Sequence, residues 1–187
     1  MENIFFDLKD LKHCGKNVII GKTVRIRYPE LVAIGDNCII DDFTYISTAL
    51  EMKKNAHISS GTKIIGGRNA LVSFDEFSTT APNVTLSAGS DDYTMGIATP
   101  FVPIKFKGNA KIGKIIIHKH CIVGAGSVVL PDVTFYEGAC VGALSLVNKD
   151  LEAWKLYAGI PAKFIRMRDE IKTKELELNY KKENNGF

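Results

Sequence analysis

The sequence lacks the features of a membrane-spanning, exported or nucleic-acid-binding protein. It has no apolar run near the roughly 20 residues of a membrane span. Its first residues, MENIFFDLKDLK, have neither the apolar core nor the small-residue cleavage site of a signal peptide. The 24 basic residues are nearly balanced by 21 acidic ones, which leaves a net charge of +3. We therefore expect a cytoplasmic protein that binds neither membrane nor nucleic acid.

Closely spaced cysteines are also missing. The four cysteines, Cys14, Cys38, Cys121 and Cys140, show no CxxC spacing. Because thiols stay reduced in the cytoplasm, we predict four free, buried thiols.

What the sequence does contain is a repeat of apolar residues with a period of six. Steps of six from Ile34 meet only apolar residues as far as Ile64, and steps of six from Ile117 do so as far as Val147. A shorter run, from Phe74 to Leu86, is displaced by about four residues, for which segment 66–69 provides the extra length. An amphipathic helix needs a period near 3.6 and a half-buried strand a period of two, so neither explains the pattern.

Other positions of each hexad point to a coil. Small or β-branched residues stand four positions after the inward residue, as at Cys121, Ser127, Val133, Ala139 and Ser145. Glycine, asparagine and aspartate follow the inward residue, where a turn needs positive φ or a small side chain. We predict an all-β solenoid in which three hexads make one coil and each coil covers its neighbours.

Two segments interrupt the repeat. Residues 87–111 form a long excursion, which we expect to be a functional loop. The end of the chain, from Asp169 to about Lys182, mixes apolar residues with many charges and predicts a surface α-helix. The expected division is therefore an N-terminal segment 1–17, the coil domain 18–168 with its loop, and a C-terminal helix and tail 169–187.

Four segments carry a family resemblance: APNVTLSAGS (81–90), IVGAGSVVLPDVTF (122–135), VGALSLVNKDL (141–151) and AGIPAKFIR (158–166). With them the chain resembles the hexapeptide-repeat acetyltransferases, including the galactoside and maltose O-acetyltransferases. The loop sequence GSDDYTMGIATPFVP (89–103) looks closer to the branch that acylates surface-polysaccharide sugars, including dTDP-linked 4-amino-4,6-dideoxy sugars.

The resemblance implies a left-handed parallel β-helix, although parallel crossovers are generally right-handed and the hand does not follow from the repeat itself. It also implies a homotrimer with a cleft between each pair of subunits, in which acetyl-CoA lies along the C-terminal coils and no metal is needed. By matching to the family motifs, the residues expected to bind the cosubstrate are Ala125, Ala143, Asn148, Lys149, Lys163 and Arg166.

One departure from the family concerns the catalytic base. The O-acetyltransferases carry a histidine at the start of the loop, and the matching position here is Asp91. An aspartate is ordinarily too weak a base to activate a sugar hydroxyl, whereas a neutral amine attacks a thioester without prior deprotonation. The departure therefore favours the amino group of a nucleotide-linked amino sugar as the acceptor.

His57 is the candidate replacement for the missing base, because it directly precedes an inward isoleucine near a coil corner. Asp91 is an alternative base, and Asp91 and Asp92 are also expected to orient the imidazole or to bind the acceptor. Asp92, Tyr93 and Asn83 are the candidate substrate-binding residues. The remaining histidines, His13, His118 and His120, are expected to face water.

Three other functions stay open at this stage. An O-acetyltransferase of a glycoside or polysaccharide hydroxyl would use His57 as its base. A metal-dependent hydratase would use three histidines across a subunit boundary. A non-catalytic β-helix scaffold would bind no coenzyme A at all.

Overall fold

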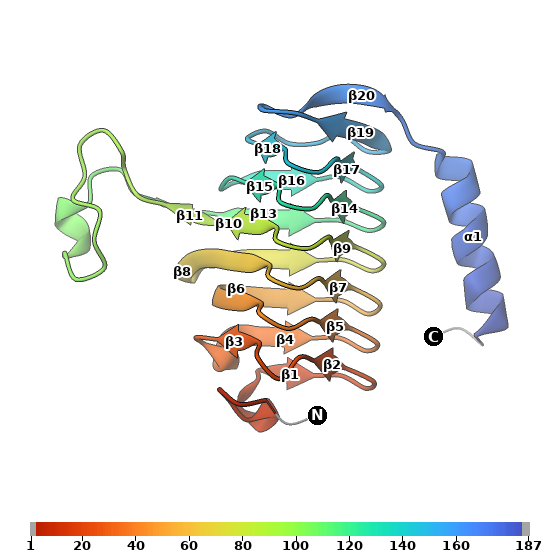
Figure 1. The fold of residues 1–187 in the computed structure, drawn as a ribbon, viewed down its shortest axis with the longest axis horizontal. Helices are drawn as coiled ribbons and strands as arrows, with labels where there is room; N and C mark the ends of the chain where they lie inside the picture. The colour runs from red at the N-terminus through yellow and green to blue at the C-terminus, as the bar shows by residue number, and fades with distance from the viewer. Residues whose placement is uncertain (1–2, 185–187) are drawn as a thin grey trace.

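The chain winds into a parallel β-helix of about seven turns, and the computed structural model describes residues 3–184 (Figure 1). Each coil contributes one short strand to each of three faces. The first face stacks β1 (His13–Cys14), β4 (Val32–Ile34), the end of β6 (Tyr45–Met52), the end of β8 (Lys63–Phe74), β13 (Lys114–Ile117) and β16 (Val133–Phe135).

The second face stacks β2 (Ile19–Ile20), β5 (Ile39–Ile40), β7 (His57–Ile58), β9 (Thr79–Thr80), β14 (Ile122–Val123), β17 (Cys140–Val141) and β19 (Lys155–Ala158). The third face stacks β3 (Arg25–Ile26), the beginnings of β6 and β8, β10 (Thr85–Ser87), β15 (Val128–Val129) and β18 (Leu146–Val147). β6 and β8 bend round a corner, so each belongs to two faces.

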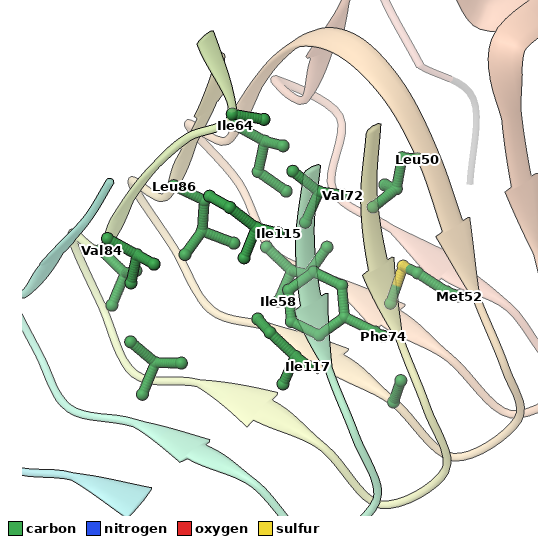
Figure 2. Packing of buried hydrophobic residues seen from close by; sticks show 14 of the residues in the cluster. Leu50, Met52, Ile58, Ile64, Val72, Phe74, Val84, Leu86, Ile115 and Ile117 are labelled. Atoms are coloured by element: carbon green, nitrogen blue, oxygen red, sulfur yellow. The ribbon is translucent and has the colours of Figure 1, made fainter. Parts of the chain in front are cut away.

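The residues of the six-residue period fill the interior, as predicted. Ile34, Ile58 and Leu86 are fully buried, and the predicted small corner residues, from Cys121 to Ser145, are buried as well. Figure 2 shows the side chains of Ile58, Phe74 and Ile117 converging on this interior from β7, β8 and β13. Because each coil covers the apolar face of the next, burial of this column stabilises the whole stack. The predicted fold class is thereby confirmed.

Positive φ angles recur at the corners, but not only at the residue types expected there. Asn37 and Asn55 have φ of 56° and 60°, as the turn pattern predicts. The equivalent corners of later coils hold Phe77, His120 and Trp154, with φ of 57°, 61° and 56°. Side chains at these corners point away from the coils, which leaves their aromatic rings available to cover another element.

Two irregularities in the coils match the predicted ones. The extra residues at 66–69 form a bulge inside β8, since Thr48 pairs with Gly67 and Ala49 with Leu71. The long loop leaves after β10 on a stem of two antiparallel strands, β11 (Gly89–Ser90) and β12 (Lys111–Ile112). It contains the short 3-10 helix η3 (Ile104–Phe106) and projects away from the coils (Figure 1).

At the C-terminal end, β20 (Lys163–Met167) turns back antiparallel to β19 and covers the last coil. Helix α1 (Glu170–Glu183) follows, with the Asp169 side chain capping its start through the Lys172 N–H, and agrees with the predicted helix. Figure 1 shows α1 running along the side of the coils remote from the loop. The rest of the predicted tail, 185–187, lies outside the described residues.

The N-terminal part joins the coils earlier than expected. A 3-10 helix, η1 (Leu8–Asp10), precedes β1, and a second, η2 (Pro29–Leu31), precedes β4. β1 already pairs with β4, so strand pairing begins before residue 18. The division into three segments remains a prediction.

The cysteines and the helices bear on two of the sequence expectations. All four cysteines are free, but Cys14 is exposed, so the expectation of buried thiols is correct for three of them. Within residues 3–184 no helix has the length and apolar character needed to span a membrane.

Candidate active site

A groove of about 660 Å³ lies where the loop stem meets the third face. It is lined by Ile65, Ser87, Gly89, Ser90, Asp91, Asp92, Tyr93, Thr94, Asn109, Lys111, Leu130, Pro131 and Asn148. The groove therefore brings together three predicted acceptor residues, Asp91, Asp92 and Tyr93, with one predicted coenzyme A residue, Asn148. The other groove residues of the coils, such as Ile65, Ser87 and Leu130, were not predicted, because a pattern of inward residues says little about outward ones.

Two glycines set the position of the loop stem. A Cβ atom on Gly89 would lie 2.7 Å from the carbonyl oxygen of Gly66, closer than real side chains come. The stem can thus lie directly on the β8 bulge only because both positions lack a side chain. The bulge and the loop are one structural unit, which places Asp91 beside the third face.

Asp92 holds the loop together. Its Oδ1 accepts hydrogen bonds from the Thr94 hydroxyl at 2.6 Å and the Thr94 N–H at 2.8 Å, and its Oδ2 accepts one from the Asn109 N–H at 2.8 Å. These hydrogen bonds, the Thr94 hydroxyl first, hold the pKa of Asp92 well below its usual range. The carboxylate thus joins the two ends of the loop across residues 94–109.

Asp91 is arranged differently from its neighbour. Its carboxylate is exposed and accepts no hydrogen bond within residues 3–184, although Lys107 Nζ lies 4.0 Å from Oδ1. Tyr93 is also exposed, at 93%. Asp91 and Tyr93 are therefore free to contact a bound molecule, whereas the oxygens of Asp92 are already hydrogen-bonded.

His57 lies outside this groove, on the second face. Its Nε2 is 2.9 Å from Asp41 Oδ2, and its Nδ1 is 3.1 Å from the Thr79 hydroxyl. The sequence predicts that Asp91 and Asp92 orient the imidazole, but within one chain the carboxylate at the ring is Asp41. Asp41 follows the inward Ile40 one coil earlier, so the coil register is the signal that could have predicted this pair.

Asn83, Ala125 and Ala143 stack along the corner between the second and third faces. The Gly126 N–H donates to Pro82 O and the Leu144 N–H to Ala125 O, so each corner lies on the previous one. A Cβ on Gly124 would lie 2.5 Å from the Ala143 nitrogen, which shows how closely these corners pack. Small residues leave the corner backbone open to an extended ligand, as the predicted role of Ala125 and Ala143 requires.

The predicted phosphate-binding cations spread over the last coil. Lys149 follows β18, and Lys163 lies next to β18 because the Ala162 N–H donates to Leu146 O. Arg166 lies further along β20 and lines a pocket of about 500 Å³ over the second face. All three are exposed and form no ion pair within the described part of the chain, so they are available to an anionic ligand.

The expectation that His120 faces water is wrong. It is 9% exposed, stacks on Phe77 with 5.5 Å between ring centroids, and lies 2.7 Å from Glu177 of α1 through Nε2. His118 stacks on Tyr136, and His13 is exposed. Among residues 3–184 no three histidine, cysteine or acidic side chains lie close enough together to hold a metal ion.

The comparisons with known proteins agree with this geometry. No protein-family model matches the chain. The dTDP-4-amino-4,6-dideoxy-D-glucose acyltransferase of Escherichia coli is 35% identical over 174 residues, which cover 91% of this chain and 88% of that protein.

Solved structures extend the comparison. AntD, an N-acyltransferase from Bacillus cereus, has been crystallised as a serine-to-cysteine variant with dTDP-4-amino-4,6-dideoxyglucose and coenzyme A. It matches this chain with a TM-score of 0.89 at 33% identity, over 98% of this chain and 100% of that one. A hexapeptide-repeat acetyltransferase from Vibrio cholerae shares the fold alone, with a TM-score of 0.55 at 17% identity over 87% of this chain and 77% of that one.

The chain belongs to the hexapeptide-repeat acyltransferases, which are built on a left-handed parallel β-helix. The family resemblance and the hand taken from it are thereby confirmed. Within the family, the E. coli acyltransferase and AntD share a third of their residues with this chain over nearly its whole length. The chain is an acyltransferase of their kind.

Proposed function

We propose that the protein transfers an acyl group from acyl-CoA to the amino group of a nucleotide-linked amino-deoxy sugar, in the synthesis of a surface polysaccharide. The observation that carries the proposal is the match to AntD and the E. coli acyltransferase over nearly the whole chain, loop included. It is supported by the groove, in which the exposed carboxylate of Asp91 at the loop base accepts no hydrogen bond from the described part of the chain.

The chemistry needs little from the protein beyond placement. The neutral amino nitrogen of the acceptor attacks the thioester carbonyl carbon, the C–S bond breaks, and the released sulfur takes up the proton that leaves the nitrogen. The products are an amide and free coenzyme A. Asp91 is suited to accept a hydrogen bond from the amino group and to orient its lone pair, while Lys107 keeps positive charge beside the carboxylate.

The residues that the family motifs suggest for coenzyme A lie on the C-terminal coils, and we place the cosubstrate along them. Ala125 and Ala143 leave the corner backbone accessible to the pantetheine arm, and Asn148 reaches the groove from the end of β18. Lys149, Lys163 and Arg166 form no ion pair within residues 3–184 and are suited to the phosphates of the nucleotide end. AntD has been crystallised with 3-hydroxybutyryl-CoA, so acyl groups larger than acetyl belong among the donors to be tested.

We propose that the working form is a homotrimer in the cytoplasm, where free thiols persist. The loop carries six large side chains that are at least half exposed in the described chain: Tyr93, Met95, Ile97, Phe101, Ile104 and Phe106. Phe101 is 99% exposed. An apolar surface of this kind is suited to a neighbouring copy of the chain, and packing there would bring the loop of one subunit to the coils of the next.

If the loop of a neighbouring subunit packs against the second face, His57 lies at that boundary. The His57–Asp41 pair resembles the imidazole and carboxylate of a general base, and this observation favours O-acylation of a sugar hydroxyl as the second candidate function. Asn83 stays a predicted substrate-binding residue. The two candidates differ in the atom acylated, so the acceptor decides between them.

The test is an acyl-transfer assay that follows free thiol. Purified protein is incubated with acetyl-CoA or 3-hydroxybutyryl-CoA and either dTDP-4-amino-4,6-dideoxyglucose or dTDP-glucose, which has a hydroxyl in place of the amine. We expect thiol release and an amide product when the acceptor is the amino sugar, and neither when the acceptor is dTDP-glucose. Release with dTDP-glucose at the same rate would establish O-acylation, and no release with any amine or hydroxyl acceptor would refute the proposal.

A further inference from the structure

A largely buried lysine lies beside Asp91 at the base of the loop. Lys107 directly follows η3, and its side chain is only 18% exposed although it carries a full charge. Its Nζ lies 4.0 Å from Oδ1 of Asp91, which is too far for a hydrogen bond. Within residues 3–184 the ammonium group donates no hydrogen bond, so the described chain supplies no acceptor for any of its three N–H groups.

Other half-buried lysines of the chain have such an acceptor. Lys119, whose side chain is 26% exposed, donates to Glu177 at 2.5 Å. Lys155, at 28%, donates to Glu152 at 2.7 Å. An ammonium group that leaves water without an acceptor loses hydration that no contact in the chain replaces. An oxygen atom of a bound ligand would replace it at Lys107.

The backbone of the loop fixes the position of Lys107. A Cβ atom on Gly96 would lie 2.3 Å from the Lys107 carbonyl oxygen, so only glycine lets these two segments pack together. On the other side, the Asn109 N–H donates to Asp92 at 2.8 Å. Because Asp92 directly follows Asp91, the two ends of the loop are held side by side. The Asp91 carboxylate and the Lys107 ammonium group therefore form a fixed pair at the edge of the groove.

This pair presents one hydrogen-bond acceptor and one donor to a bound sugar. Their separation of 4.0 Å can be bridged by two polar groups on adjacent ring carbons, each within hydrogen-bond distance of its own partner. In a 4-amino-4,6-dideoxy sugar, one carbon next to the amine carries a hydroxyl group and the other carries the methyl branch. The hydroxyl at C-3 is therefore the group that can reach Lys107 while the amine contacts Asp91.

We infer that Lys107 donates a hydrogen bond to the hydroxyl group next to the acceptor's amine, so that Asp91 and Lys107 together select a vicinal amino alcohol. The inference rests on the proposed function and adds a residue that determines which amino sugars are accepted. A hydrogen bond from Lys107 to the amine itself would occupy the lone pair that attacks the thioester. An acceptor that lacks the hydroxyl leaves the ammonium group without an acceptor and should react poorly.

The experiment combines one substitution with one change in the acceptor. kcat/KM is measured for the wild-type enzyme, Lys107→Met and Lys107→Arg, with dTDP-4-amino-4,6-dideoxyglucose and with its analogue that lacks the C-3 hydroxyl. The wild-type enzyme should prefer the hydroxylated acceptor roughly 10- to 100-fold, the range for a hydrogen bond to a charged group. Lys107→Met should lose this preference, because its kcat/KM falls for the hydroxylated acceptor and changes little for the analogue. Lys107→Arg retains a donor and should keep part of the preference.

Lys105→Met is the matched control, because Lys105 is an exposed cation of the same loop that lies over the Phe106 ring. It should leave kcat/KM unchanged for both acceptors. Coenzyme A binding, measured by calorimetry, should be the same in all variants and shows that they are folded.

The outcomes separate this inference from the function on which it rests. No preference in the wild-type enzyme, or an undiminished preference in Lys107→Met, would overturn the inference, and activity with the amino sugar would leave the proposed function standing. An equal loss with both acceptors in Lys107→Met would also overturn it, because Lys107 would then act on the acyl group or on the shape of the loop. A wild-type protein that acylates neither acceptor would refute the proposed function and the inference with it.

Discussion

Nε2 of His57 lies 2.9 Å from Oδ2 of Asp41, and the opposite ring nitrogen lies 3.1 Å from the Thr79 hydroxyl. Both ring nitrogens therefore have partners within the chain. To act as a base, the imidazole would have to give up its contact with the Thr79 hydroxyl and contact the hydroxyl or amino group of the sugar substrate instead. A role in orienting residues at a subunit boundary requires no such exchange.

We predict that His57→Ala and Asp41→Asn reduce kcat for an amino sugar by less than about tenfold at pH 9. General-base catalysis contributes roughly 10²–10⁴-fold where a hydroxyl must be activated, and a neutral amine does not need it. The measurement is the pH dependence of kcat for both variants beside the wild-type enzyme. A loss of a hundredfold or more that persists at high pH would make His57 the base.

Asp92→Asn should loosen the loop without unfolding the coils. The substitution weakens the acceptor of the Thr94 and Asn109 hydrogen bonds, and trypsin should then cut faster at Lys105 and Lys107. The acceptor kcat/KM should fall, while the melting temperature stays within a few degrees of the wild-type value. Asp91→Asn is the control, because it should lower kcat/KM and leave the rate of proteolysis unchanged.

The same loop should be insensitive to pH in the neutral range. Since hydrogen bonds lower the pKa of Asp92, they are fully present above the unfolded carboxyl value near 4 and are lost as the pH falls through the lower folded value. The rate of proteolysis of the wild-type loop, divided by the rate for an unstructured peptide under the same conditions, should therefore be constant from pH 6 to pH 9. A rate that rises across this range would show that another group holds the loop.

The coils could be predicted from the sequence because the inward residues obey one period, from Ile34 to Val147, and burial leaves no freedom of position there. The site could not be predicted to the same depth. Outward residues such as Asp41 and His57 follow no period, and their pairing depends on coil register. Phe77 and His120 show the same limit, because the coil pattern marks their corners as outward and does not predict that helix α1 lies over them.

Glu177 fastens α1 to the coils, and Glu177→Gln should lower the free energy of unfolding by about 1–3 kcal/mol. Glu177 contacts Lys119, Lys181 and His120, and these hydrogen bonds outweigh burial and lower its pKa to about 2. The stabilisation is therefore complete above the unfolded carboxyl value near 4.5 and is lost as the pH falls toward 2.

Urea denaturation at pH 7 and at pH 2 measures this contribution. The difference between wild type and Glu177→Gln should be present at pH 7 and much reduced at pH 2. Glu175→Gln is the matched control, since within residues 3–184 Glu175 pairs only with Lys172 of the same helix. Equal effects of the two substitutions at pH 7 would show that Glu177 contributes no more than an exposed pair.

Phe74→Ala should destabilise the coils by about 3–5 kcal/mol, because it leaves a cavity in a closely packed interior. Phe74 is 1% exposed, whereas Phe43, at a coil corner, is 74% exposed. Phe43→Ala should therefore change the free energy of unfolding by less than about 0.5 kcal/mol. Similar losses of stability for the two variants in urea denaturation would contradict the assignment of Phe74 to the interior column.

Ala143→Trp tests the coenzyme A groove directly. Ala143 is exposed at a corner that packs closely on Gly124 and Ala125, and an indole there would cover the backbone along which the pantetheine arm is proposed to lie. We expect KM for acetyl-CoA to rise at least tenfold and KM for the amino sugar to change little. Ala153→Trp places the same ring at an exposed position in the turn that follows Leu151, outside the proposed groove, and should leave both values unchanged. If Ala143→Trp leaves KM for acetyl-CoA unchanged while the protein stays folded, the coenzyme does not follow this corner, and the cations of β20 would bind some other anion.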